Sequence, residues 1–388
     1  MISPYVSSHN SNLYDKIKIA FFIFSGVAIV RFIMFFLLFI LSNILIYICL
    51  LGYSTKDSNG NFINFSQIRR FFIFIPQIIL RISLIFLGFY WFNENIGFNM
   101  FNFNYLERDN SAKLLIFNHI SFIDSLYLFC RGFPSGVTSY NNLNLPIVGS
   151  IVKKMEPILV PTNDEQRKQV PDAKTQITNR LTHPSIDTFK RPLVIFPEGV
   201  TKNGKYLFKF QQGAFMNDVT YQPILLKYDF KYYDPSWTFN NTSYQCMFFL
   251  CCQFVNTLKV EYLEPCNKSI DEIRKVYLDK LQLIDCNLSN HDNHFLYSHK
   301  DKVDYIYQYV YEKGTYNINY YRNLTKLKNN EISKIINLFY SLDILKEGVI
   351  IIDEISNDKI QNALHLNKSI QLKEKITFNK FITLLYSN

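Results

Sequence analysis

A long apolar stretch near the amino end constrains this chain more than any other feature. It runs from residue 19 to residue 53, interrupted by Arg31 and a few small or polar side chains. The stretch is too long for a signal-peptide core and lacks a small-residue cleavage site. Since a spanning helix needs about 20 apolar residues, residues 32–53 suffice to cross a bilayer, with Arg31 snorkelling to the interface. A re-entrant hairpin is the alternative.

A second apolar stretch, residues 71–92, carries polar side chains at helical spacing. One narrow stripe collects Arg70, Gln77, Arg81 and Gly88 opposite a broad phenylalanine, isoleucine and leucine face. This amphipathic pattern favours a helix lying in the headgroup plane, and a buried core helix is the alternative. We therefore expect residues 1–92 to form a membrane anchor with interfacial helices.

The charge balance indicates which binding partners suit this chain, and the cysteines indicate its redox compartment. Lysine plus arginine outnumber aspartate plus glutamate 41 to 32 among 388 residues, which suits anionic headgroups or phosphates. No zinc-finger spacing or dense basic stripe is present, so we expect no nucleic-acid partner. The seven cysteines form no CxxC pair. We expect them to be reduced packing residues in a domain that faces the cytosol.

After residue 92 the pattern changes to short apolar runs that end in polar clusters, which is typical of an α/β domain with a mostly parallel sheet. Three strand-sized runs are residues 113–117, 192–196 and 223–228. The first two lead into polar clusters, and in open parallel sheets ligands bind at the carboxyl ends of strands. We expect these two clusters to face one crevice within a catalytic domain of residues 93–285.

The first polar cluster runs from Asn118 to Asp124 and contains His119 and Ser121. A histidine is suited to remove a hydroxyl proton near neutral pH, and an aspartate can fix its tautomer. The five-residue step predicts that His119 lies in the loop before a helix, with Ser121 as N-cap and Asp124 at N3. An ordinary capping box beside an incidental histidine is the alternative.

The second cluster, Phe196-Pro197-Glu198-Gly199, is a strand end turned by proline with one carboxylate. Glu198 can accept a hydrogen bond from a glycerol hydroxyl, or it is an exposed glutamate in an ordinary turn. Beyond it lies a group of lysines that offers point charges for a phosphate or forms a solvated face. Its members are Lys202, Lys205 and Lys209.

The two clusters together resemble the NHxxxxD and FPEGT boxes of the lysophosphatidate acyltransferase superfamily, in the order and separation of that family. Val200 replaces the threonine of the second box, and Thr201 follows it. The segments 146–149, 157–160, 164–168, 210–215, 222–228, 237–238, 252–254 and 260–265 are similar to the EF-hand branch of the lysophosphatidylcholine acyltransferases. The resemblance covers residues 31–265.

The resemblance implies a glycerolipid acyltransferase fold in which His119 is the base and Asp124 its partner. It also implies acyl-CoA as donor and an FPEG box that helps to hold a lysophospholipid acceptor. Two cations of the family pattern are replaced. Thr162 stands where the family has an arginine, with Arg167 the nearest arginine downstream, and Gln211 stands where it has a lysine.

The C-terminal residues 331–388 resemble a degenerate EF-hand pair, joined to the catalytic domain by a linker, residues 286–330. A helix over residues 332–340 leads into a loop that offers Asp343, Glu347 and Glu354 to a metal. Leu345 and Ile351 supply no side-chain oxygen, so we expect no tight calcium binding and no bound cofactor. A second loop, residues 369–380, is expected to be a packing partner. A helical tail without this ancestry is the alternative.

The sequence therefore predicts an enzyme that transfers a fatty acyl group from acyl-CoA to a lysophospholipid, with lysophosphatidylcholine favoured. We expect it at a membrane, the endoplasmic reticulum, with its catalytic domain in the cytosol. One alternative is a lysophosphatidate acyltransferase. Another is a non-catalytic membrane scaffold with an EF-hand-like interaction module. The acceptor headgroup and the oligomeric state stay open.

Overall fold

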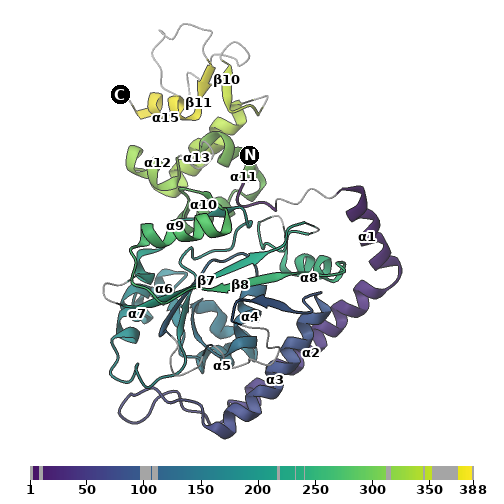
Figure 1. Cartoon of the computed structure of the whole chain (residues 1–388). Coiled ribbons are helices and arrows are strands. Elements are labelled where there is room, and N and C mark those ends of the chain that lie inside the picture. The colour runs from purple at the N-terminus through teal and green to yellow at the C-terminus, as the bar shows by residue number, and fades with distance from the viewer. Residues whose placement is uncertain are drawn as a thin grey trace. The chain divides into compact units, whose positions relative to one another are not determined.

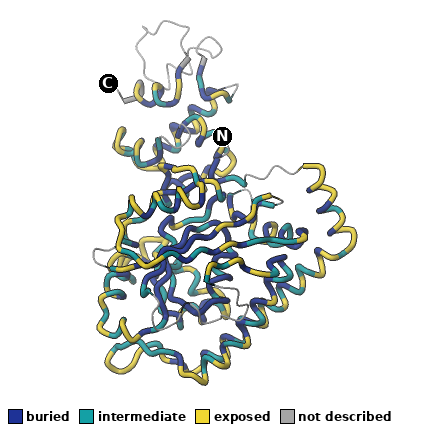
Figure 2. Tube along the Cα trace, viewed as in Figure 1, coloured by how far each residue is buried: buried dark blue, intermediate teal, exposed yellow. Residues whose placement is uncertain are grey.

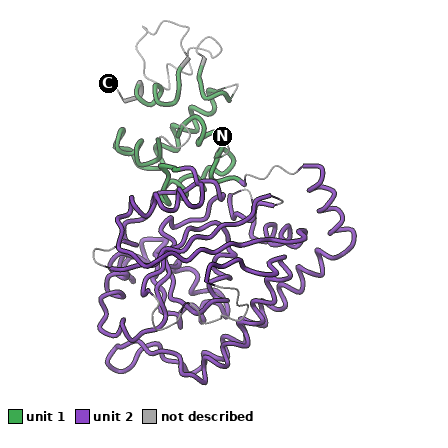
Figure 3. The backbone as a smooth tube through the Cα atoms, viewed as in Figure 1, with its two compact units in different colours: residues 1–6, 285–388 green, residues 7–284 purple. Residues whose placement is uncertain are grey.

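The computed structural model divides the chain into two compact units (Figure 3). Unit 1 consists of residues 1–6 and 285–388, and unit 2 of residues 7–284. The residues that the structure describes are 3–7, 12–96, 106, 112–215, 219–231, 233–239, 241–311, 316–343, 346–351 and 375–386. The boundary falls one residue from the predicted end of the catalytic domain.

Unit 2 is built around a seven-stranded sheet of order β1-β8-β7-β2-β5-β3-β4 (Figure 1). The strands are β1 (Phe92–Glu94), β2 (Leu114–Phe117), β3 (Ser135–Ser139), β4 (Ile158–Val160), β5 (Leu193–Ile195), β7 (Tyr221–Tyr228) and β8 (Leu258–Tyr262). All neighbouring strands run parallel except β7 and β8. This confirms the predicted α/β fold with a mostly parallel sheet.

The register of the sheet brings the two polar clusters together. Strand β2 lies between β5 and β7, with Ile116 opposite both Ile195 and Pro223. Because β2 and β5 are parallel neighbours, the residues that follow Phe117 and Ile195 leave the sheet at the same edge. The three strands predicted from the apolar runs are present, and the two clusters do share that edge.

Helices cover both faces of the sheet. The helices of this part are α4 (Ile123–Arg131), α5 (Val148–Lys153), α6 (Asp164–Gln169), α7 (Ala173–Leu181), α8 (Ser243–Cys251) and α9 (Ile270–Leu281), with short elements η2 (Tyr140–Asn144), β6 (Tyr206–Leu207), η3 (Gln212–Ala214) and β9 (Ile284–Asp285). Leu115 and Phe117 pack into a core with α3, α4 and α8, while Leu114 and Ile116 pack with α7 and α9. Successive side chains of a strand point to opposite faces, so one short strand supplies both cores. Figure 2 shows that the strands of the sheet are mostly buried.

The amino-terminal apolar region folds into three helices, α1 (Leu13–Phe24), α2 (Val27–Cys49) and α3 (Gln67–Phe86). Gly26 adopts a φ of 75° between α1 and α2 and breaks the apolar run there. Among the described residues α2 alone is long and apolar enough to cross a membrane, and only 17% of its most apolar window is buried. Helix α3 packs along α2, where the Ser42 hydroxyl donates to the Pro76 carbonyl over 2.8 Å (Figure 1).

Two arginines of these helices, Arg81 and Arg31, bind protein carbonyls, which differs from the expectation that they face the membrane interface. Arg81 is buried and donates to the carbonyls of Phe89 and Tyr90 over 2.8 and 2.6 Å. Arg31 does not snorkel outward, because its guanidinium donates to the Gln253 carbonyl over 2.7 Å just beyond the end of α8. Carbonyls that lack helical partners attract such cations, so Arg31 and Arg81 tie α2 and α3 to the segments that follow α8 and α3.

Unit 1 is helical, and most of its helices lie in the segment that we expected to be a linker. Its elements are α10 (Asn290–Tyr297), η4 (Lys300–Lys302), α11 (Val303–Tyr305), η5 (Ile306–Val310), α12 (Ile318–Thr325), α13 (Asn329–Leu342), β10 (Val349–Ile351), β11 (Lys375–Thr377) and α15 (Phe378–Tyr386). Residues 286–330 belong to unit 1 and contain its helices α10, α11 and α12. Tyr5 is also buried in this unit, near Asp292 and Tyr311.

Candidate active site

The imidazole of His119 and the carboxylate of Asp124 meet at the carboxyl end of β2. His119 Nδ1 lies 2.8 Å from Asp124 Oδ2. His119 follows the strand and precedes α4, so its position in a loop allows a contact that a five-residue step along one helix would not. The histidine side chain is 20% exposed, whereas that of Asp124 is fully buried.

Four donors hold the Asp124 carboxylate. Oδ2 accepts from the main-chain N–H groups of Ile120 and Ser121 over 2.7 and 2.9 Å as well as facing the imidazole. Oδ1 accepts from the hydroxyl of Tyr228 over 2.5 Å. Burial, together with the neighbouring Asp124 charge, raises the pKa of Tyr228 well above its ordinary value, so this phenol stays a neutral donor. The carboxylate is fixed and faces His119 as an acceptor.

The start of α4 differs slightly from the predicted capping box. The helix begins at Ile123, and its N-cap is Phe122 instead of Ser121. The Ser121 hydroxyl accepts only a 3.4 Å bond from the N–H of Ile123. The Asp124 side chain turns back toward the N–H groups of the loop, which a helix N-terminus favours for a carboxylate.

Phe196 fixes the plane of the His119 ring. The two ring centroids lie 4.2 Å apart with an interplanar angle of 24°, a stacked arrangement. An ionised carboxylate only accepts hydrogen bonds, so Nδ1 carries the proton in the contact with Asp124. The lone pair of Nε2 is then the basic position of the ring. The two polar clusters thus meet directly through His119 and Phe196.

Glu198 is buried and already partnered, which changes the expectation that it accepts from a substrate hydroxyl. Its Oε1 accepts from the N–H of His119 over 3.2 Å, and Oε2 accepts from the N–H of Phe208 over 2.9 Å. Lys202 Nζ lies 2.5 Å from Oε2, with both side chains at most 1% exposed. Lys202 is therefore an internal ion-pair partner instead of a free surface cation.

Three other predicted residues shape the loops around the site. Asn118 is buried and bridges to β7, since its amide donates to the Leu226 carbonyl and accepts from the Leu226 N–H over 2.9 and 2.8 Å. Gly199 adopts a φ of 70° and closes a turn by donating to the Phe196 carbonyl over 2.9 Å. The Pro197 carbonyl accepts from the N–H of Gln211. These contacts position the loops and leave the His119 ring facing outward.

The remaining predicted substrate contacts lie in accessible positions. Lys205 and Lys209 are exposed, and Thr201 is half-buried. Arg167 is 66% exposed and pairs with Asp164 at 3.3 Å on α6. Helix α6 follows β4, which lies three strands from β2, about 14 Å across the sheet at the usual strand spacing. The structure does not bring Arg167 to the imidazole.

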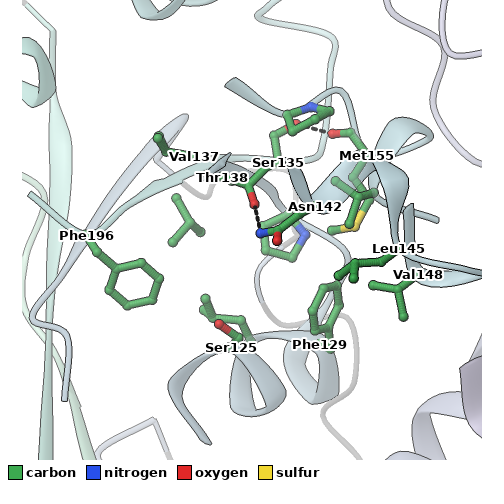
Figure 4. Close-up of a pocket in the computed structure, with 16 residues that line it drawn as sticks. Ser125, Phe129, Ser135, Val137, Thr138, Asn142, Leu145, Val148, Met155 and Phe196 are labelled. Atoms are coloured by element: carbon green, nitrogen blue, oxygen red, sulfur yellow. Dashed lines mark hydrogen bonds between the residues drawn. The ribbon is translucent and has the colours of Figure 1, made fainter. Parts of the chain in front are cut away.

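A largely apolar cavity of about 270 Å³ adjoins the site (Figure 4). Phe196 forms part of its wall, and Ser125 and Phe129 of α4 face it from another side. The other lining residues are Leu128, Pro134, Ser135, Gly136, Val137, Thr138, Asn142, Leu145, Val148, Val152, Met155, Pro157 and Val194. Phe196 therefore touches both the cavity and the imidazole, because it lines the cavity and stacks on His119, which itself does not line it.

Hydrogen bonds within the protein hold the acidic side chain of the loop after α13. The Asp343 carboxylate accepts from the N–H of Gly348 over 2.7 Å and from the Tyr305 hydroxyl over 2.5 Å. The Lys346 ammonium donates to the Asp343 carbonyl over 2.7 Å. Strands β10 and β11 pair antiparallel with Ile350 opposite Ile376. Glu354 and residues 369–374 lie outside the described residues. Within the described residues, no group of acidic, histidine or cysteine side chains suits a metal.

Sequence reasoning missed the roles of two residues at the site. The sequence places Tyr228 only in a strand, and Lys202 only in a lysine group that binds a phosphate or forms a solvated face. Tyr228 ends a strand next to β2, so its place in the predicted sheet was a signal that it lies close to Asp124. Nothing in the local pattern indicates that Lys202 is buried, because the ion pair depends on how the loop after β5 folds back.

Comparisons with known proteins agree with this geometry. Residues 102–227 match the family described as Acyltransferase. "Lysophospholipid acyltransferase LPEAT2" of Arabidopsis thaliana is 29% identical over 65% of this chain and 43% of its own length. "Lysophosphatidylcholine acyltransferase" of Drosophila melanogaster is 34% identical over 41% of this chain and 29% of its own length.

The chain thus spans less than half the length of these two relatives. A solved structure, the LPA acyltransferase PlsC from Thermotoga maritima, covers 70% of this chain and 95% of its own with 12% identity and a TM-score of 0.40, too weak a likeness to establish a shared fold. The family match contains both His119 and Asp124 together with the Phe196–Gly199 turn. Residues 102–227 therefore match the Acyltransferase family, and part of the chain is similar to lysophospholipid acyltransferases.

Proposed function

We propose that this chain transfers a fatty acyl group from acyl-CoA to the free hydroxyl of a lysophospholipid, with lysophosphatidylcholine as the favoured acceptor. The contact between His119 Nδ1 and Asp124 Oδ2 carries the proposal. It leaves Nε2 as a base in a partly exposed position, while the carboxylate behind it is buried and fixed. This is the arrangement that removes a proton from an alcohol at neutral pH.

In the proposed reaction, Nε2 of His119 takes the proton as the lysolipid oxygen attacks the thioester carbonyl. A carbon–oxygen bond forms, and the carbonyl electrons move onto its oxygen. When they return, the carbon–sulfur bond breaks, and the CoA thiolate takes the proton from the imidazolium. Asp124 stays ionised and stabilises the transient positive ring, as its buried hydrogen-bonded position favours.

The apolar cavity beside Phe196 suits the acyl chain of the donor. Its walls are mostly aliphatic and aromatic, so each methylene that enters gains about 0.8 kcal/mol from leaving water. Phe196 lines this cavity and stacks on His119, which supports a binding mode in which the carbonyl end of the chain extends past Phe196 toward the base. The exposed Lys205 and Lys209 lie on the segment after the Phe196–Gly199 turn and supply charge for phosphate groups.

We place the protein at a membrane surface, the cytosolic face of the endoplasmic reticulum, through its amino-terminal helices. Phe24 is 90% exposed, Ile68 73% and Phe71 67%, which is unusual for apolar side chains in water. Further exposed apolar residues on α1, α2 and α3 are Leu13, Ile17, Phe21, Val30, Ile33, Leu37, Ile40, Ile48, Phe72 and Ile75. Arg31 of α2 and Arg81 of α3 instead donate hydrogen bonds to protein carbonyls, so the exposed surface of these helices is mainly apolar. Lipid is the environment that suits such a surface.

An acceptor-by-donor panel with purified protein tests the proposal. We expect acyl transfer from acyl-CoA to lysophosphatidylcholine, and a fall of about 10² to 10⁴ in rate for His119→Ala, the usual contribution of a general base. His291→Ala, an exposed histidine of α10, is the matched control and should keep full activity. Preference for lysophosphatidate would select that acyltransferase class instead. Transfer to no lysophospholipid would favour the non-catalytic scaffold.

A further inference from the structure

Lys202 and Glu198 form the one ion pair of the described residues that touches the main chain of His119 on both sides. Glu198 Oε1 accepts from the N–H of His119 over 3.2 Å, and Lys202 Nζ donates to its carbonyl over 3.3 Å. The two side chains meet at 2.5 Å. Both polar groups of one peptide residue are thus held by a single pair of opposite charges.

His119 needs such partners because it belongs to no helix or strand. It lies after β2 ends at Phe117 and before α4 begins at Ile123, so no ladder or helical turn satisfies its N–H and carbonyl. Buried main-chain groups must find partners, and here side chains from the loop after β5 provide them. The ion pair thus supplies the hydrogen-bond partners that strand neighbours supply to main-chain groups elsewhere in the sheet.

Stability alone does not explain a buried pair of this kind. Removing two charges from water carries a large desolvation penalty, and well-packed apolar residues of similar volume are often at least as stable. The pair is at most 1% exposed, so it bears that cost in full. What an apolar pair could not provide is a donor and an acceptor aimed at the two sides of His119.

We propose that Lys202 is a positioning residue that, paired with Glu198, fixes the backbone of His119 and thereby the direction of its Nε2. Asp124 and Phe196 fix the orientation of the imidazole ring, and the ion pair fixes the position of the His119 main chain. Neither Lys202 nor Glu198 contacts the substrate on this view, and the lysine supplies no charge to a lipid phosphate. A displacement of about 1 Å at a catalytic group costs roughly 10² in rate, which gives the expected scale.

The inference rests on the proposed transfer activity, and kinetics separate it from a phosphate-binding role. We expect Lys202→Met to lower kcat by about 10 to 100-fold with the KM for lysophospholipid unchanged. Glu198→Gln combined with Lys202→Met leaves no unpaired charge and should fold normally, yet keep the low kcat. Lys275→Met, an exposed lysine of α9, should behave as the unmodified protein. A raised KM at full kcat, or full kcat in the double variant, would overturn the inference while the transfer activity stands.

A second measurement does not depend on turnover. Diethylpyrocarbonate modifies imidazole nitrogens, and mass spectrometry of the peptide containing His119 gives the rate of that modification. If the ion pair holds His119 against Asp124 and Phe196, the rate rises several-fold in both the single and the double variant and not in Lys275→Met. An unchanged rate in the folded double variant refutes the positioning role even if the purified protein transfers no acyl group.

Discussion

Gly136 offers a direct way to test whether the cavity receives the acyl chain. It lies in β3 and pairs with Val194 of β5, and both residues line the cavity. A Cβ added at Gly136 meets no heavy atom within 4 Å, so a larger side chain has open space before it. The position is also a strand interior, where a residue with a side chain is preferred over glycine by about 0.5–1 kcal/mol. Gly136→Leu should therefore fold.

The magnitude follows from the space that leucine would take. Its side chain has about as many carbons as four methylenes, and each methylene excluded from the cavity forfeits about 0.8 kcal/mol of binding. Long-chain donors should lose about 3 kcal/mol, a factor of roughly 200 in kcat/KM. Gly136→Ala removes room for a single methylene and should cost about fourfold. A short chain that stops before this point should react as well as it does with the unmodified protein.

The assay compares kcat/KM for short-chain, medium-chain and long-chain acyl-CoA donors at a fixed acceptor concentration, with the short chain as internal control. The reasoning predicts a loss that grows with chain length and with side-chain size at position 136. An equal loss for every donor would mean that the substitution disturbs β3 or the imidazole instead. Unchanged long-chain activity in Gly136→Leu would show that the acyl chain binds elsewhere.

Two substitutions and two measurements on the unmodified protein test other parts of the structure. Tyr228→Phe removes a hydrogen bond to the Asp124 carboxylate and should lower the free energy of unfolding by about 1.5–3 kcal/mol in urea titration, whereas Tyr244→Phe, 66% exposed, should not. Tyr5→Ala should destabilise unit 1 by about 3–5 kcal/mol and speed amide hydrogen exchange in residues 285–343, unlike Tyr297→Ala at an exposed position. Calorimetry should detect no micromolar calcium binding, because hydrogen bonds already occupy Asp343; saturable heat would refute this. Burial raises the pKa of Cys130 to about 12 and that of Cys246 to about 11, so both thiols stay protonated at neutral pH. Both should therefore escape alkylation in native protein at neutral pH, and labelling should increase as the pH approaches those values.

The sheet and the pairing of the two polar clusters could be predicted because their signals are local. Residues 113–117 and 192–196 are apolar runs that end in polar residues, and a parallel sheet brings such ends to one edge. The position of His119 in a loop also followed from spacing, because a five-residue step on a helix separates two side chains. A pattern of this kind fixes which residues can meet without reference to the rest of the chain.

The direction of a polar stripe could not be predicted in the same way. The periodicity of α3 correctly collects Gln77 and Arg81 on one face, yet water and protein carbonyls satisfy such groups equally well. The structure supplies carbonyls, those of Phe129 for Gln77 and of Phe89 for Arg81. Which partner is available depends on how distant segments fold, and the same dependence hid the ion pair of Lys202 and the helices of residues 286–330.

Phe196 connects the chemistry of the site to the binding of the chain. One face of its ring stacks on the base, and the same side chain lines the cavity proposed to hold the acyl group. Two residues later Glu198 holds the N–H of His119, so a single turn after β5 contacts the ring, the main chain and the cavity. A chain that fills the cavity poorly would leave Phe196 free to shift, and the imidazole would lose one of its two supports. Selection for chain length should therefore appear in kcat as well as in KM, because the wall of the cavity is also the support of the base.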